Sequence, residues 1–419
     1  MRPDLPGSPR TGRFHRRLAV AVALVLAFMV PAAFAMKPIP LDWKHTVGDP
    51  SVLKTTKKYV VVATGAKVNR ALSKDGKVWK WKSSALAAFP SWAKPNGGDI
   101  WAADIAKVGS KYLLYFAAPV KGKTVSSRCI GVATATKANG QFYPIPGPPL
   151  VCPTWSKLGA EDQVADVVEP STPPSPTATP SDCLTPTESP TPGDGDSSPG
   201  DGASTPSDGL PTVYPTPDCG PSTPPAPVTN SWVIGAIDPS LFVDTDGTPY
   251  LLYKTDGKPS SIRMLPLSGD GLHAAPGATS RQVVQYSGVL ENPVMIHRSG
   301  QYYLFDSQGD YARCSYMTVW RSAPTLTGLT TAGAHRLLTR KNTKKLCGPG
   351  GADVLAQPNR VLMYFEAWTC KKYKACHKNF WFFSKKDAKK NPKRALYAVK
   401  LGFPGGVPVV KKFLKGKKK

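Results

Sequence analysis

The chain has 419 residues and a mass of 44.9 kDa, which suits one large domain or two ordinary ones. Apolar residues make up 41% of it and aromatic residues 9%, so full-length disorder is excluded. The formal net charge of +26 favours anionic partners, but no nucleic-acid-binding motif accompanies it, and we expect no nucleic acid partner.

Residues 1–35 have the pattern of a secretory signal peptide. Three arginines at positions 13, 16 and 17 precede the apolar stretch 18–35, which ends in the small-x-small sequence Ala33-Phe34-Ala35. A membrane anchor is the alternative, because the stretch is just long enough to cross a bilayer core of roughly 30 Å. Pro31 lies where a cleavage region is usual, so we expect cleavage near Ala35 and a secreted, extracellular protein without a membrane span.

An internal repeat predicts the fold. Each copy has an acidic residue that opens a short apolar strand, then a tight polar turn and a second, aromatic strand, which together indicate a β-hairpin. The copies are residues 48–64, 102–118, 237–255, 291–307 and 351–367. A period of roughly 50 to 70 residues is typical of propeller blades, so we predict an all-β, five-bladed β-propeller. A β-sandwich is the alternative, but it does not require this recurrence.

One segment interrupts the repeats. Residues 161–230 hold eleven acidic residues and no Lys or Arg, in a background of Pro, Ser, Thr and Gly that cannot bury enough apolar surface to fold. We predict a long disordered insertion between blades two and three. Blades one and two then occupy residues 36–160, and blades three to five occupy residues 231–410.

The C-terminal end is strongly basic. Residues 371–419 contain 17 Lys and Arg but a single acidic residue, and the chain ends in a basic tail, residues 411–419. Such a tail could bind an anionic cell-wall polymer by electrostatic attraction. The alternative is a solvated tail that only improves solubility.

The cysteine count fits an exported protein. Eight cysteines in an oxidising compartment favour disulfide bonds, whereas a zinc site is the less favoured alternative because no C-x-x-C pair is present. Closeness along the chain and shared segments predict the pairs Cys370–Cys376, Cys183–Cys219 and Cys129–Cys152, which leaves Cys314 with Cys347.

Carboxylates are expected to gather at the propeller axis. The first strand of each blade lines the central channel, so the acids that open these strands should converge at one mouth of it. Like charges in one cavity cost free energy, and proteins retain them for a metal or for catalysis. One or two of them could instead hydrogen-bond the neighbouring backbone. The acids are Asp49, Asp104, Asp238, Glu291 and Asp353.

Several motifs carry a family resemblance. The sequences GDPSVLK at 48–54, WAADI at 101–105, AIDPSLF at 236–242 and LENP at 290–293 occur in the right order, and the likeness runs from about residue 48 to about 368 outside the insertion. The chain resembles glycoside hydrolase family 43, five-bladed propellers that cleave arabinose- and xylose-containing polysaccharides. It departs from the family pattern in having Ala103 for a usual proline and Asn292 for a usual alanine.

The resemblance implies residue roles for an inverting mechanism. Asp49 would be the general base that activates water, and Glu291 the general acid that protonates the leaving oxygen. Asp238, kept negative beside Glu291, would hold the acid's proton in place. Trp101 and Ile237 would contact the sugar, although Trp101 could equally be a core residue between blades.

A metal is not expected. Many members of the family have a histidine after a G-P-G sequence in blade five that helps to hold a central ion, whereas this chain has Gly351 there. We therefore predict no metal ligand and no cofactor, and a central calcium or sodium ion is the less favoured alternative.

The sequence thus predicts a secreted glycosidase that cleaves arabinofuranosyl or xylosyl linkages in plant polysaccharide such as arabinan, arabinoxylan or xylan. The alternative is a non-catalytic carbohydrate-binding propeller held at the cell envelope by its basic tail. Retention of all three acids argues against that alternative. A related retaining furanosidase would carry a W-M-N-D-P-like signature, which is absent.

Overall fold

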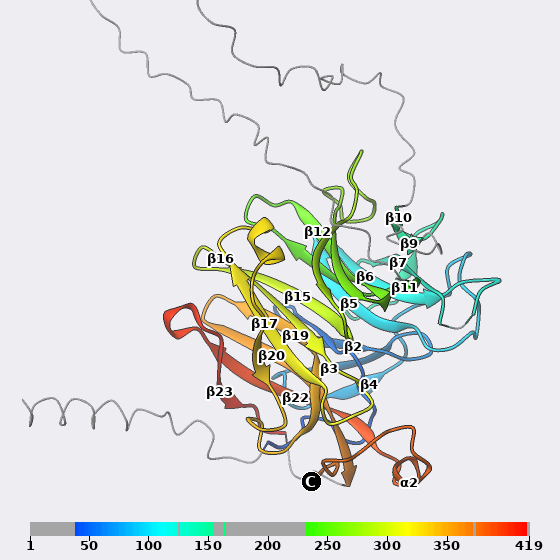
Figure 1. Ribbon diagram of the computed structural model, residues 1–419. Helices are drawn as coiled ribbons and strands as arrows, with labels where there is room; N and C mark the ends of the chain where they lie inside the picture. Colours follow the sequence, from blue (N-terminus) through cyan, green and yellow to red (C-terminus); the bar gives the residue numbers. More distant parts are fainter. Residues whose placement is uncertain (1–37, 125, 154–161, 165–231, 372–373, 417–419) are drawn as a thin grey trace, which may run out of the picture. The chain divides into compact units, whose positions relative to one another are not determined.

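The computed structural model describes residues 38–124, 126–153, 162–164, 232–371 and 374–416 (Figure 1). The predicted signal peptide, the Cys183–Cys219 pair and most of the predicted insertion lie outside these ranges. Within them the regular secondary structure is almost entirely β-strand, and helix is limited to α2 (Lys385–Ala388) and the 3-10 turns η3 (Thr327–Thr330) and η4 (Pro404–Gly406). No helix of the described part is long and apolar enough to cross a membrane.

The strands form successive antiparallel meanders. The first consists of β1 (Ser51–Lys54), β2 (Tyr59–Ala63), β3 (Asn69–Ser73) and β4 (Lys80–Lys82). The second consists of β5 (Trp101–Val108), β6 (Lys111–Pro119), β7 (Arg128–Ala135) and β8 (Tyr143–Pro144), and β7 also pairs with β9 (Val151–Pro153), which pairs with β10 (Asp162–Val164). The third consists of β11 (Trp232–Val243), β12 (Pro249–Lys258), β13 (Ser260–Pro266) and β14 (Arg281–Tyr286).

Two further meanders complete the described part. The fourth consists of β15 (Leu290–Arg298), β16 (Gln301–Gln308), β17 (Met317–Ala323) and β18 (His335–Leu338). The fifth consists of β19 (Cys347–Gln357), β20 (Arg360–Lys371), β22 (Lys393–Gly402) and β23 (Val409–Phe413), with β21 (Lys374–Ala375) paired to β20. Each predicted hairpin is confirmed as the first strand pair of a meander.

Turn chemistry explains why these hairpins form. Between β15 and β16 the two turn residues Ser299 and Gly300 have φ of 50° and 72°, which matches the right-handed twist of the paired strands. The turn before β12 places Gly247 at φ 90°, a conformation that only glycine adopts without strain. In the strands themselves, aromatic and β-branched residues dominate, and every residue of β2 is buried.

The first strands of the meanders contact one another in a cycle: β1 with β5, β5 with β11, β11 with β15, β15 with β19, and β19 with β1. The hydrophobic core follows the same order. Each of five buried clusters combines residues of two neighbouring meanders, and one of them joins Val61 of the first meander to Leu362 and Leu396 of the fifth. The segment before β1 adds to this closure, because the Val47 N–H donates to the Arg394 carbonyl over 2.8 Å.

Three of the predicted disulfides are confirmed. Cys129 bonds to Cys152, Cys314 to Cys347, and Cys370 to Cys376. These six cysteines are therefore not available to a zinc ion.

The predicted insertion and the predicted basic tail each include residues of a strand. The insertion was placed from residue 161, but residues 162–164 form β10. The basic tail was placed from residue 411, but β23 continues to Phe413 as an outer strand of the fifth meander. Val410 and Phe413 are buried while Lys411 and Lys412 are exposed, so the two lysines lie on the exposed face of an amphipathic strand.

Candidate active site

A pocket of about 300 Å³ lies where the first strands begin. All five residues proposed from the sequence for catalysis and substrate contact line it, and they come from the first, second, third and fourth meanders. The lining consists of Asp49, Thr64, Asp99, Trp101, Ile237, Asp238, Lys254, Asp256, Glu291, Asn292, Tyr311 and Arg394.

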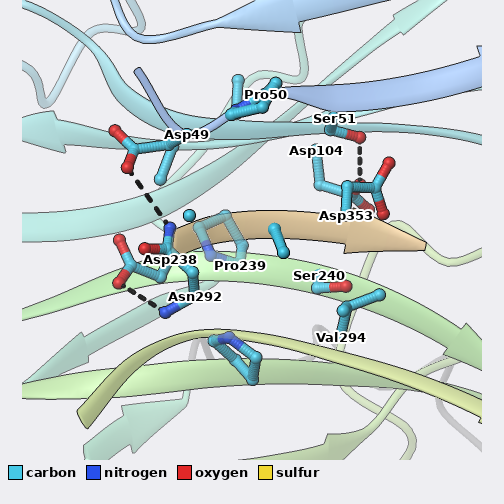
Figure 2. Close-up of a pocket in the computed structure, with 15 residues that line it drawn as sticks. Asp49, Pro50, Ser51, Asp104, Asp238, Pro239, Ser240, Asn292, Val294 and Asp353 are labelled. Carbon is cyan, nitrogen blue, oxygen red and sulfur yellow. Dashed lines mark hydrogen bonds between the residues drawn. The ribbon is translucent and has the colours of Figure 1, made fainter. Parts of the chain in front are cut away.

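The expected convergence of five acids at one mouth is wrong for two of them. Asp104 and Asp353 do not line this pocket but a narrow space of about 30 Å³ inside the channel (Figure 2). Figure 2 shows them on the side away from Asp49 and Asp238. Their position along the strand explains this. In its own meander, each of these two acids lies two residues after the residue that corresponds to Asp49.

That place is defined by backbone conformation. Each first strand contributes three consecutive residues to the channel, and the first of the three always has a left-handed φ. The five are Asp49 (52°), Ala102 (44°), Asp238 (55°), Asn292 (50°) and Gly351 (54°). A left-handed residue kinks the strand, so that a side chain here points to the mouth instead of into the sheet.

Hydrogen bonds from neighbouring meanders fix these kinks. Four of the left-handed residues donate their N–H to a side chain of the preceding meander, and the fourth bond ties the first meander to the fifth. The bonds are Ala102 to Thr64 Oγ1 (2.9 Å), Asn292 to Asp238 Oδ2 (3.0 Å), Gly351 to Ser307 Oγ (2.9 Å) and Asp49 to Glu366 Oε2 (3.0 Å).

Donors surround the Asp49 carboxylate. The Thr64 hydroxyl donates to Oδ2 over 2.6 Å, and the Asn292 amide donates to Oδ1 over 3.4 Å. The Arg394 guanidinium lies 3.6 Å from the same Oδ1. These contacts hold the carboxylate in one orientation, as a general base needs.

Asp238 is enclosed more deeply, with 7% of its surface exposed. Burial raises the pKa of Asp238 well above its usual range, the charges of Glu291 and Asp49 add to the effect, and Lys254 opposes it. This shift opposes the negative charge that the resemblance implies for Asp238, because burial outweighs the attraction of Lys254.

Glu291 forms an ion pair that the sequence analysis missed. Lys254 Nζ donates to Glu291 Oε2 over 3.0 Å and lies 3.3 Å from Asp256 Oδ1. Burial alone would lower the pKa of Lys254, but Glu291, Asp256 and Asp238 together raise it above its ordinary value. The ammonium therefore stays charged at working pH.

A second buried pair lies behind Asp49. Glu366, 1% exposed, accepts from the Asp49 N–H and, over 3.1 Å, from Arg394. Burial raises the pKa of Glu366 to about 8; Arg394 counteracts part of this rise and Asp49 adds to it. Glu366 thus positions the backbone of Asp49 from outside the pocket.

The two proposed sugar contacts form the pocket wall. Ile237 is 5% exposed and pairs in register with Lys254. The Arg128 guanidinium covers one face of the Trp101 ring, 3.4 Å from its centroid. Arg128 is itself buried and donates to the carbonyls of Asp99 and Ala117, so the Trp101 ring is held rigidly.

The two carboxylates of the channel accept hydrogen bonds from the surrounding strands. Asp104 accepts from the Ser51 hydroxyl and the Leu241 N–H, and Asp353 accepts from the N–H groups of Val52 and Val354. Among the described residues, no group of three or more His, Cys, Asp or Glu is placed to hold a metal ion. We route no step of the reaction through a metal.

Comparisons with known proteins agree with this fold and site. The family model "Glycosyl hydrolases family 43" matches residues 43–151 and 212–383. A thermostable family-43 glycoside hydrolase of known structure is 18% identical with a TM-score of 0.58, covering 92% of this chain and 98% of that one. The α-L-arabinanase of Cellvibrio cellulosa, complexed with arabinohexaose, is 16% identical with a TM-score of 0.55, covering 87% and 95%.

An endo-1,4-β-xylanase from Bacteroides thetaiotaomicron is 18% identical with a TM-score of 0.52, covering 90% of this chain and all of that one. No curated protein matches the sequence. The structural neighbours share the propeller-like all-β fold. Since the family model covers more than half of the chain, the chain belongs to glycosyl hydrolases family 43.

Proposed function

We propose that the protein is a secreted, inverting glycosidase that cleaves arabinofuranosyl or xylosyl linkages in plant polysaccharide. The observation that carries the proposal is the meeting of Asp49, Asp238 and Glu291, from three different meanders, in one pocket. The three disulfides are compatible with secretion. The cycle of first-strand contacts supports a five-bladed propeller, with residues 161–230 inserted between its second and third blades.

In the proposed reaction Asp49 takes a proton from the attacking water, and Glu291 gives one to the departing oxygen. Asp238 interacts with both of these groups. Its carboxylate accepts from the N–H of Asn292, the residue after Glu291, and the charges of Glu291 and Asp49 both raise its pKa. Trp101 and Ile237, which also line the pocket, would contact the sugar.

The substrate is proposed at the level of plant polysaccharide or oligosaccharide. The arabinanase and xylanase among the structural neighbours support arabinan, arabinoxylan and xylan as the first substrates to test. The basic C-terminal tail, with no acid after Asp387, would add electrostatic attraction to an anionic cell-wall polymer.

One observation favours the alternative of a carbohydrate-binding propeller without hydrolysis. A general acid must reach the departing oxygen, whereas Glu291 Oε2 already contacts Lys254 Nζ over 3.0 Å. Substrate binding would have to rearrange this pair before Glu291 could donate.

The test is hydrolysis of nitrophenyl arabinofuranoside, nitrophenyl xyloside and debranched arabinan by the wild type and by single variants. Asp49→Asn and Glu291→Gln should each lower turnover by on the order of 10² or more, the size expected for loss of a general base or acid. Asp104→Asn, whose side chain lies in the channel outside the pocket, should do much less.

Melting temperatures of all variants would show whether they fold. The anomeric configuration of the first product, followed by NMR, tests inversion. Wild-type turnover of debranched arabinan by Glu291→Gln would overturn the assignment, and binding without hydrolysis of any substrate would favour the alternative.

A further inference from the structure

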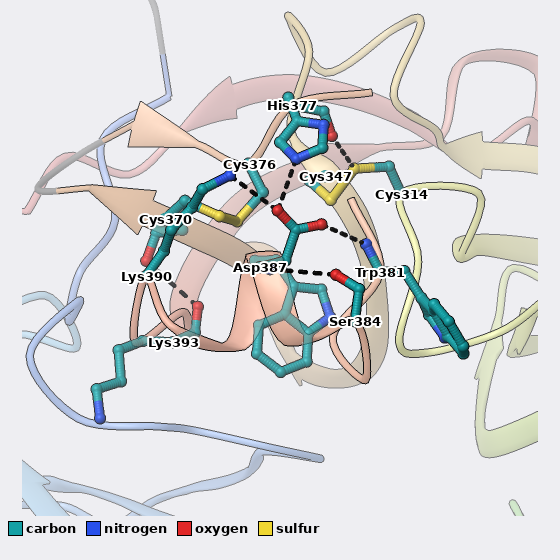
Figure 3. The surroundings of a disulfide bond; sticks show 12 residues. Cys314, Cys347, Cys370, Cys376, His377, Trp381, Ser384, Asp387, Lys390 and Lys393 are labelled. Atoms are coloured by element: carbon teal, nitrogen blue, oxygen red, sulfur yellow. Dashed lines mark hydrogen bonds and ion pairs between the residues drawn. A yellow bond between two sulfur atoms is a disulfide. The ribbon is translucent and has the colours of Figure 1, made fainter. Parts of the chain in front are cut away.

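A small second core lies beside the pocket. It contains the disulfides Cys314–Cys347 and Cys370–Cys376, together with the buried rings of Trp368 and Phe380. Figure 3 shows the two disulfides on one side of the segment that carries Trp381, Ser384 and Asp387. Residues 377–391 are thereby attached to the main fold at several points.

Hydrogen bonds hold this segment in shape. The buried Asp387 carboxylate accepts from the Trp381 N–H over 3.1 Å and pairs with His377 and Lys390 over 2.9 and 2.8 Å. The Phe382 N–H donates to the Ala312 carbonyl over 3.0 Å. A segment fixed in this way loses little conformational entropy when it binds a ligand.

The held segment presents aromatic rings to solvent. Phe383 is 57% exposed and Trp381 is 39% exposed, and their ring centroids lie 6.4 Å apart. In Figure 3 the Trp381 indole points away from Asp387 and from the disulfides. Exposed apolar groups that lie together, unlike ones scattered singly, mark ligand-binding or interaction sites.

The rings are continuous with the active-site pocket. Tyr311, which lines the pocket and is 38% exposed, packs edge to face against Phe383 with centroids 6.2 Å apart. The Trp368 indole N–H donates to the Tyr311 carbonyl over 2.7 Å, which ties Tyr311 to the second core. Arg394, which contacts Asp49, lies 5.7 Å from the Tyr311 ring centroid.

We propose that Tyr311, Phe383 and Trp381 form an aromatic platform that binds the part of a polysaccharide chain lying outside the pocket. Aromatic faces suit the C–H faces of sugar rings, because the ring face carries partial negative charge and the ring edge can still meet water. The path from Tyr311 to Trp381 leads outward from Asp49, so its occupant is the chain that continues from the cleaved unit.

This inference rests on the proposed function, because it takes the pocket as the place of cleavage. The inference goes beyond the proposed function because it assigns an extended binding site and hence a preference for polymers over small glycosides. The surrounding lysines would attract anionic chains at low salt, so the test is done at 0.5 M NaCl, where the Debye length is below about 5 Å.

The first experiment is affinity electrophoresis in gels containing debranched arabinan or arabinoxylan. The wild type should be retarded by at least one of them, and the double variant Trp381→Ala, Phe383→Ala should bind about tenfold more weakly, a usual loss for exposed aromatic contacts at a binding site. Tyr143→Ala is the matched control, because Tyr143 is 64% exposed on β8 and does not line the pocket.

The second experiment compares kcat/KM for the polymer with kcat/KM for a nitrophenyl glycoside. The ratio should fall about tenfold in the double variant and stay at the wild-type value in Tyr143→Ala. Equal retardation and an equal ratio in the double variant and the wild type would refute the platform. If nothing is hydrolysed but retardation still depends on Trp381 and Phe383, the proposed function is wrong and the platform stands.

Discussion

The proton held by Glu366 gives the sharpest test of the site's electrostatics. Its carboxyl is buried behind Asp49, and burial raises its pKa from an ordinary 4.5 to about 8. Between these two values the native state binds more protons than the unfolded chain. The stabilisation is therefore complete below about pH 4.5 and is lost as the pH rises through about 8.

The size of the effect follows from the shift. A difference of roughly 3.5 pH units at about 1.4 kcal/mol per unit corresponds to about 5 kcal/mol of unfolding free energy, of which about 4 kcal/mol falls between pH 5 and pH 9. Since Glu366 is 1% exposed, solvent screening reduces this little. Glu366→Gln removes the titrating group and keeps an oxygen that can accept from the Asp49 N–H.

The assay is urea unfolding, followed by tryptophan fluorescence at one-unit steps from pH 5 to pH 9. Unfolding free energy of the wild type should fall by up to about 4 kcal/mol more over this range than that of Glu366→Gln. Asp310→Asn is the control, because the Asp310 side chain is 43% exposed and should leave the pH dependence unchanged. Parallel curves for the wild type and Glu366→Gln would show that Glu366 is ionised throughout, which would refute a pKa raised by burial.

Two further predictions concern the periphery. Replacing Cys129 and Cys152 by alanine should lower the unfolding free energy by about 3 kcal/mol, because the bond closes a loop with a sequence separation of 23 residues; urea unfolding measures this, and an unchanged midpoint would contradict it. A chain ending at Leu414 keeps β23 but lacks the last lysines, and it should bind anionic cell-wall polymer more weakly than the full-length protein at low salt and equally at several hundred millimolar. Pull-down across a salt series decides this, and equal binding at every salt concentration would leave the last lysines as a solubilising tail only.

The sequence was sufficient for the hairpins, three disulfides and five of the residues that line the pocket. Turn residues such as Ser299-Gly300 act locally, so their effect is readable without the rest of the fold. The expectation failed for Asp104 and Asp353, because acids that look equivalent in the repeats differ by two residues in the strand. A left-handed residue sets the position of each side chain; Gly351 suggests that conformation by its residue type, the Asp and Asn residues are compatible with it, and Ala102 gives no sign of it.

The missed ion pair at Lys254 has a specific physical cause. The segments YLLYF at 112–116 and YLLYK at 250–254 align Phe116 with Lys254, a core position. Strand pairing gives a different correspondence, because Ala117 pairs with Trp101 and Lys254 pairs with Ile237, at the same place in each strand. The β11–β12 hairpin is therefore offset by one residue from the alignment of the two sequence segments.

The packing supports this offset. Phe116 belongs to the core that joins the second meander to the first, and Tyr253 to the core that joins the third to the second, so Phe116 corresponds to Tyr253. A shift of one residue turns each side chain to the opposite face of a strand. The longer turn before β12 produces the shift and brings Lys254 out of the core register to the channel mouth, within 3.0 Å of Glu291. The change in turn length therefore places Lys254 against Glu291, the proposed general acid. It is also the reason why a comparison of the two sequence segments misses this cation.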